Sequence, residues 1–170
     1  MHLQTKRLLI RIIESSDILS LSKLWSDPEV TSYMGGPRNY NELLMLFNED
    51  VQAGQPAPFD LWPVIERKSA KVVGHCGLLE KDVENQPEIE LVYVIAASAW
   101  GKGFATEAAV ALQDYAFNSL GVAQLVALID PANLASARVA EKVGFSFDRE
   151  IVRPGDKVMQ VYVMQSPANK

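Results

Sequence analysis

The chain has 170 residues and is poor in several features that mark particular classes of protein. Its one cysteine, Cys76, excludes an internal disulfide. Only two histidines accompany that cysteine, so no metal-ligand spacing exists and we expect no metal. The longest apolar runs, such as Leu91 to Ala97, are far shorter than the ~20 residues of a membrane helix. We therefore expect no membrane partner.

Basic residues are also scarce. The chain has 16 Lys and Arg residues against 21 Asp and Glu residues, a formal net charge of −5. A duplex-binding domain usually carries a basic face, so this balance argues against direct binding of nucleic acid. A net charge of −5 is compatible with a cationic substrate, and a charge of this size is also usual for a soluble domain.

The remaining composition is that of a folded protein, with 48% hydrophobic and 22% charged residues. Together with the length, it predicts one domain over residues 1–170. The segment from Met1 to Arg7 has no apolar core of signal-peptide length, so the default expectation is a cytoplasmic location.

Hydrophobic periodicity predicts a mixed α/β (α+β) sheet with helices on it. The predicted strands are Leu8–Ile13, Phe59–Glu66, Lys71–Leu79, Glu88–Ile95, Ala123–Ile129, Phe145–Val152 and Lys157–Met164. Capping signals place helix starts at Ser15 or Ser16, at Asn41, after Gly103 and at Asn133. The last two helices are expected to end near Asn118 and Val143.

The segment from Trp100 to Glu107 carries the strongest chemical signal. It follows a strand and opens a helix, and Gly101 and Gly103 allow the backbone to approach a ligand closely. Free N–H groups and the dipole at a helix start favour an anion such as phosphate. The alternative is a tight turn that only needs small residues. Neither a P-loop nor a dinucleotide fingerprint fits the glycine spacing.

Several motifs occur together in a characteristic order. They are Thr5–Arg11, Leu24–Val30, Val73–Leu78, Glu90–Ile95, Trp100–Ala105, and Asn133–Arg138 with Glu141–Phe145. In this order they resemble the GNAT superfamily of acyl-CoA-dependent N-acyltransferases, in its ribosomal-protein N-terminal acetyltransferase (RimJ/RimL-like) branch. The resemblance covers nearly the whole chain. It implies a mostly antiparallel twisted sheet of about seven strands with about four helices, splayed between the fourth and fifth strands.

The resemblance also implies acetyl-CoA, or coenzyme A, as the cosubstrate. The pantetheine arm is expected in the splay, on backbone near Val94 and Ile95, and the pyrophosphate on the glycine loop. The implied cofactor-binding residues are Tyr93, Val94, Ile95, Trp100, Gly101, Lys102, Gly103, Phe104, Ala105, Thr106 and Asn133. One departure is Trp100, because the loop of this family often begins with Arg or Gln.

Glu90 is the candidate general base. An amine with a pKa near ~10 is mostly protonated at neutral pH, so a group must take its proton. Glu90 matches the usual glutamate of the branch, and its structural alternative is a carboxylate at a pocket edge. The tyrosine that serves as an acid in many members is replaced by Ala140. Ser136 is the substitute, unless it only bonds backbone in the first helical turn.

The resemblance implies that the first two helices and their loop form one wall of the acceptor cleft, which points to Trp25, Tyr33 and Met34 with the Gly35-Gly36-Pro37 loop. Trp62 and Tyr93 are expected to add aromatic surface. Core packing is the alternative for each aromatic residue. Aromatic and acidic groups together suit a cationic amine.

His75 and Cys76 are adjacent on a strand and point to opposite faces, so we do not expect them to act as a base and nucleophile. The prediction is therefore direct transfer of an acetyl group to a primary amine, either a small molecule or a protein N-terminus, by a monomer or homodimer. The alternatives are a non-catalytic acyl-CoA-binding sensor and a nucleotide-phosphate binder.

Overall fold

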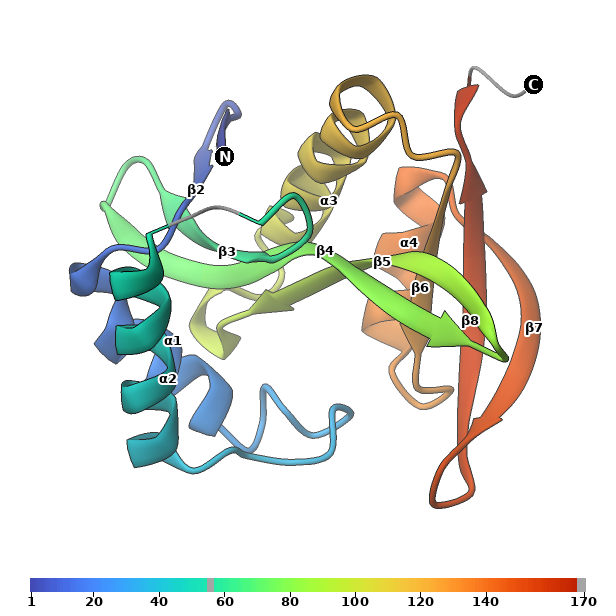
Figure 1. Cartoon of the computed structure of the whole chain (residues 1–170), viewed down its shortest axis with the longest axis horizontal. Helices are drawn as coiled ribbons and strands as arrows, with labels where there is room; N and C mark the ends of the chain where they lie inside the picture. The colour runs from blue at the N-terminus through green and yellow to red at the C-terminus, as the bar shows by residue number, and fades with distance from the viewer. Residues whose placement is uncertain (55–56, 168–170) are drawn as a thin grey trace.

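The computed structural model describes residues 1–54 and 57–167, in which eight strands form one sheet (Figure 1). The strands are β1 (His2–Gln4), β2 (Leu8–Arg11), β3 (Leu61–Glu66), β4 (Lys71–Val83), β5 (Gln86–Ile95), β6 (Gln124–Ile129), β7 (Ser146–Arg153) and β8 (Lys157–Gln165). The helices are α1 (Ile18–Ser26), α2 (Tyr40–Ala53), α3 (Phe104–Asp114) and α4 (Leu134–Val143), with short 3₁₀ turns η1 (Ser15–Asp17) and η2 (Ala97–Ala99) and a π-helical turn η3 (Tyr115–Ser119).

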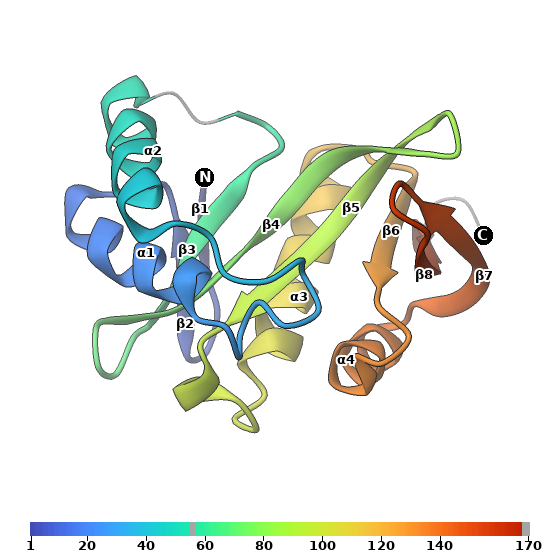
Figure 2. The same cartoon turned by 90° about the horizontal axis from the view of Figure 1, so that it is seen from below.

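The sheet has the order β1-β2-β3-β4-β5-β6-β8-β7. All neighbours pair antiparallel except β5 and β6, which are parallel and share one pair, Glu90 with Val126. From that point the two strands diverge toward their C-terminal ends (Figure 2). This confirms the mixed α/β class and the predicted splay, because β5 and β6 are the predicted fourth and fifth strands.

Helices cover both faces of the sheet. On one face, α1 and α2 pack over Val94 together with Leu21 and Phe47. On the other face, α3 and α4 pack over Leu91 and Ile95 (Figure 2). The alternation along β5 therefore matches its two apolar sides, as its period of two residues predicts. Among the described residues, no helix is both long and apolar enough to cross a bilayer.

Several predicted boundaries differ from the structure. His2 is paired in an additional edge strand, β1, and does not lie in a flexible start. The first strand ends at Arg11 instead of Ile13, β3 begins at Leu61 instead of Phe59, and β4 continues to Val83 instead of Leu79. The longer β4 pairs with β5 as far as the turn at residues 84–85. Strand ends depend on such pairing with a distant segment, which local periodicity does not contain.

Two helix caps also differ. Asn39, not Asn41, caps α2, because its side-chain oxygen accepts from the amides of Asn41 and Glu42. Ser15 lies inside η1 with Ser16, and Asp17 accepts there from the amide of Glu14 and from Arg11. Several polar residues lie near each start, and the extended backbone at one of them decides which acts as cap. The predicted cap at Asn133 is confirmed, since its side chain accepts from the amide of Ser136.

Candidate active site

A cleft of about 570 Å³ opens where β5 and β6 separate. Seven residues singled out from the sequence line it: Trp25, Tyr33, Met34, Glu90, Tyr93, Asn133 and Ser136. These residues come from α1, the loop that follows it, β5, and the start of α4. The splay of the sheet therefore brings together groups that lie up to 111 residues apart in the sequence.

The cleft has two sides, which follow from the side-chain alternation of the strands. Glu90 shares a face of β5 with Val92 and Val94, the face that packs under α1 and α2. Tyr93 lies on the opposite face, and its hydroxyl reaches α4. The predicted base and the predicted acid, Ser136, thus enter the cleft from opposite sides of the sheet.

Glu90 is the β5 member of the single pair that joins β5 to β6. Its side chain is 13% exposed, and a carboxylate oxygen lies 3.9 Å from Lys81 Nζ. Burial raises the pKa of Glu90, while Lys81, the backbone of Leu128 and Arg153 act in the opposite direction. A carboxylate with a raised pKa, in a cleft, is suited to accept a proton near neutral pH.

Ser136 and Tyr93 form a pair between α4 and β5. The Tyr93 hydroxyl donates to the Ser136 carbonyl oxygen at 2.8 Å, and Ser136 Oγ donates to the Tyr93 oxygen at 3.1 Å. Burial raises the pKa of Tyr93 to about 12. Ala140, where the family tyrosine is expected, is fully buried and brings no polar group. On this side of the cleft, Ser136 and Tyr93 supply hydroxyl groups.

The glycine loop has the backbone of an anion site. Gly101 and Gly103 have positive φ angles of 73° and 77°, which a glycine adopts without steric cost. The Glu107 amide donates to the Gly103 carbonyl at 3.1 Å, the hydrogen bond that opens α3. The amides from Gly103 to Thr106 therefore precede the first helical bond and have no partner within the helix. They point outward at the positive end of its dipole.

Trp100, the unusual first residue of this loop, is held in place by a hydrogen bond of its own side chain. Its Nε1 donates to the Ile95 carbonyl at 2.7 Å, so the indole ties the loop back to the end of β5. The side chains of Val94, Ile95 and Phe104 are buried, so only their backbone groups could meet a ligand. None of the loop residues 100–106 lines the cleft itself.

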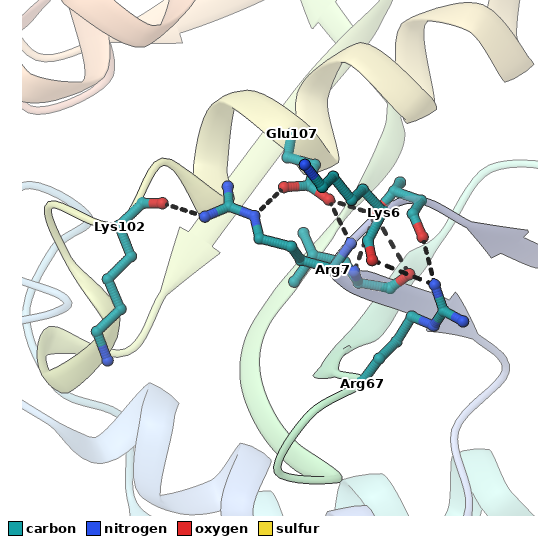
Figure 3. A network of polar contacts seen from close by, with 7 residues as sticks. Lys6, Arg7, Arg67, Lys102 and Glu107 are labelled. Carbon is teal, nitrogen blue, oxygen red and sulfur yellow. Dashed lines mark hydrogen bonds and ion pairs between the residues drawn. The ribbon is translucent and has the colours of Figure 1, made fainter.

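A polar network holds the start of α3 against the N-terminal segment (Figure 3). Glu107 accepts from Thr5 Oγ1 at 2.6 Å, from the Arg7 amide at 2.8 Å and from Arg7 Nε at 2.6 Å. Arg7 also donates to the Lys102 carbonyl at 2.8 Å and stacks 4.8 Å above the Phe104 ring. Burial alone would raise the pKa of Glu107, but the hydrogen bonds from Thr5 and Arg7 outweigh it and lower the pKa.

This network was not predicted from the sequence, where Arg7 counted only as part of a motif. Its partners lie about 100 residues apart, and no local pattern indicates such a contact. It fixes both the loop backbone and the first helical turn. A phosphate-binding loop benefits from such support, because its amides must be held in place before the ligand arrives.

The His75-Cys76 pair is separated by the strand, as predicted. His75 Nδ1 accepts from Trp25 Nε1 at 3.0 Å, on the α1 and α2 side. Cys76 is buried on the other side, and burial raises the pKa of its thiol to about 12. Trp62 was wrongly expected near the acceptor: it is 2% exposed and packs edge-on against Tyr115. Its strand position points it into the core under α3.

Five charged residues of the cleft were also missed. They are Arg38, Lys81, Asp130, Arg153 and Lys157. Each comes from a loop or strand end whose local sequence is ordinary, so only the folded arrangement shows that they meet. Within residues 1–54 and 57–167, no group of three or more His, Cys, Asp or Glu side chains is arranged to hold a metal ion.

A splayed parallel strand pair beside a glycine-rich helix start is the arrangement that the resemblance to acyl-CoA-dependent N-acyltransferases implies, and comparison with known proteins agrees. The family model described as "Acetyltransferase (GNAT) domain" matches residues 7–146. The chain therefore belongs to the GNAT family of acetyltransferases.

Particular relatives span the full length of the chain. The uncharacterized protein YkkB of Bacillus subtilis (strain 168) is 34% identical over 165 residues, 96% of this chain and 95% of that protein. A GNAT-family acetyltransferase from Bacillus anthracis has a TM-score of 0.83 at 26% identity, covering 98% of this chain and 99% of that one. The fold is also that of a Vibrio cholerae spermidine N-acetyltransferase solved with CoA and spermine, with a TM-score of 0.77 at 19% identity over 95% and 97% of the chains.

Proposed function

We propose that this protein transfers an acetyl group from acetyl-CoA to a primary amine, by direct attack within a ternary complex. The observation that carries the proposal is the position of Glu90, a largely buried carboxylate in the one pair that joins β5 to β6. It lies in a cleft whose opposite side is formed by Tyr93, Asn133 and Ser136. The acceptor is a small amine or a protein N-terminus.

The described residues fit the donor. Beyond the pair of Glu90 with Val126, no register pair joins β5 to β6, so backbone groups on their facing edges can meet the amide groups of a pantetheine arm, although the Ile95 carbonyl already accepts from Trp100. The amides from Gly103 to Thr106 suit its pyrophosphate. When bound, acetyl-CoA supplies an activated acetyl thioester. The Asn133 side-chain oxygen is engaged in capping α4, which leaves its NH₂ group to donate to a ligand.

Glu90 accepts the proton that the amine nitrogen loses as the new C–N bond forms. The role needs an ionised carboxylate, and Lys81 at 3.9 Å favours that form against the effect of burial. On the other side of the cleft, a proton must reach the departing sulfur as the C–S bond breaks. Ser136 Oγ would donate it by turning its hydrogen away from the Tyr93 oxygen, to which it donates at 3.1 Å, while water in the cleft returns a proton to Oγ.

The test is release of free thiol from acetyl-CoA with a panel of amines. Glu90→Gln should lower turnover by about 10²-fold or more, the usual contribution of a general base, while leaving the Kd for CoA nearly unchanged. Glu80→Gln is the matched control, because Glu80 is an exposed carboxylate on β4 outside the cleft. An equal loss of CoA binding in Glu90→Gln would contradict the base role, and CoA binding without turnover on any amine would favour a sensor.

A further inference from the structure

The cleft carries a charge opposite in sign to that of the whole chain. Four basic residues line it, namely Arg38, Lys81, Arg153 and Lys157, against the two carboxylates of Glu90 and Asp130. The lining is thus net +2, whereas the chain has a formal net charge of −5. A polycationic amine would meet repulsion here, so the acidic composition is no guide to the acceptor.

The basic groups lie on the side of the cleft that faces away from the donor. In the β7-β8 pair, Arg153 lies opposite Lys157, and both share the face of Ile151 and Met159. That face packs with Val126, and α4 packs on the other face, with Ala127 and Ile129. Glu90 shares its own face with α1 and α2. The glycine loop precedes α3, on the opposite face, so these cations are not placed to hold the phosphates of CoA.

Two of the four cations already have carboxylate partners. Lys81 lies 3.9 Å from Glu90, and Lys157 Nζ lies 3.7 Å from Asp130 while donating to the Tyr33 carbonyl at 2.9 Å. Lys157 therefore ties the loop after α1 to the β7-β8 hairpin. Its charge is largely satisfied within the protein.

Among the residues that the structure describes, the other two cations have no carboxylate within ion-pair distance. Arg38 stacks 5.1 Å from the Trp25 ring and donates to the Gly36 carbonyl, so its guanidinium is held at the mouth of the cleft. Arg153 is half-buried, and within residues 1–54 and 57–167 it forms no ion pair and no side-chain hydrogen bond. Its charge still acts on Glu90. A partly buried arginine that has no hydrogen-bonded anion is stabilised when a ligand supplies one.

We propose that the acceptor amine carries an anionic group, a carboxylate or a phosphate, which Arg153 binds with Arg38 while the amine meets Glu90. The proposal rests on the acetyl transfer proposed above and names the class of its acceptor. A guanidinium offers two parallel N–H donors that match the two oxygens of such a group. The anion would then fix the distance between its own amine and the base.

The first experiment compares matched amines in the thiol-release assay at low salt. The pairs are β-alanine with β-alaninamide, O-phosphoethanolamine with ethanolamine, and the amidated peptides Ala-Asp-Gly with Ala-Asn-Gly; spermidine is the cationic probe. We expect kcat/KM about tenfold or more higher for the anionic member of at least one pair, as for a charge-assisted hydrogen bond. The pair that shows the effect identifies the source of the anion. Equal values in every pair, or preference for spermidine, would overturn the proposal.

The second experiment separates binding of the anion from an effect on the base. Arg153→Gln should raise KM for the preferred anionic amine about tenfold and leave KM for its neutral partner unchanged. If Arg153 only tuned Glu90, kcat would change equally for both members and the pH profile would move. Lys68→Gln is the control, since it removes one positive charge from an exposed turn between β3 and β4. Arg153→Lys keeps the positive charge and loses the two parallel N–H donors of the guanidinium. It should raise KM for the anionic amine less than Arg153→Gln does.

A readout without turnover keeps the two proposals distinct. Binding of N-acetyl-β-alanine and of its amide to the CoA-loaded protein is measured by calorimetry. Tighter binding of the acid, lost in Arg153→Gln, would support the anion site even if no amine in the panel were acetylated. Failure of acetylation alone would count against the proposed function, and equal binding of acid and amide would count against the anion site.

Discussion

Acid should weaken this protein through one buried imidazole. His75 is 6% exposed and accepts a hydrogen bond from Trp25 at Nδ1, so the neutral ring carries its proton on Nε2. Phe47 and Trp25 both pack edge-on against the His75 ring, with ring centroids 5.7 Å and 6.2 Å away. Protonating Nδ1 would replace an acceptor by a donor facing the indole N–H.

The size of the effect follows from the pKa. Burial lowers the pKa of His75 to about 4 from its ordinary value of 6.5. The unfolded chain therefore binds this proton more readily than the folded protein does. The stabilisation is fully present above pH 6.5 and is lost progressively as the pH falls toward 4. At about 1.4 kcal/mol per pH unit, the loss amounts to roughly 3 kcal/mol.

The assay is urea unfolding followed by circular dichroism at several pH values between 7.5 and 4.5. Carboxylates with raised pKa values, such as Glu90, act in the opposite direction, so the comparison is between the protein and its His75→Asn variant. Their difference in unfolding free energy should shrink by roughly 3 kcal/mol on acidification. His2→Asn, at an exposed histidine, is the control. Parallel pH curves for the protein and His75→Asn would refute the reasoning.

Three further predictions concern the donor site and the thiol. Gly103→Ala should weaken CoA binding measured by calorimetry, because φ of 77° costs a residue with a Cβ about 1–2 kcal/mol and displaces the loop amides; unchanged affinity would place the phosphates elsewhere. Glu107→Gln should also weaken CoA binding and lower the unfolding free energy by about 1 kcal/mol through loss of the Arg7 ion pair. Adding Arg7→Lys to this variant should restore neither the CoA affinity nor the unfolding free energy. Cys76, fully buried with a pKa raised to about 12, should react with a thiol reagent only after unfolding; rapid labelling of the native protein would reopen a covalent mechanism.

The elements that could be predicted are those whose signal is local. The alternation of side chains from Ile89 to Ile95 predicts which residues lie on each face of β5. Asn133 and Gly144 predict the start and the end of α4. In each case one segment carries the whole pattern, since a strand face repeats every two residues and a cap needs three or four neighbours. Asn41 was the wrong cap for the same reason: two asparagines lie close together, and only the backbone angles at Asn39 decide between them.

The candidate site was predicted unevenly. Glu90 and Ser136 were found because they stand in family motifs, and the cleft does bring them together. Arg153 and Arg38 stand in no motif and lie 115 residues apart, so nothing in their neighbourhoods indicates a shared site. The Arg7 and Glu107 network was missed likewise. Contacts of this kind depend on how the sheet is registered and splayed.

The sequence by itself determined the family, the order of the strands and helices from Leu8 onward, and the loop of Gly101 and Gly103 that we propose as the donor site. Those features are written in short-range patterns and in the order of motifs along the chain. Only the tertiary structure decided the sign of charge in the cleft, which is net +2 in a chain of net −5. Net charge sums residues without regard to position, whereas a ligand meets the field of the few groups that the fold gathers around it.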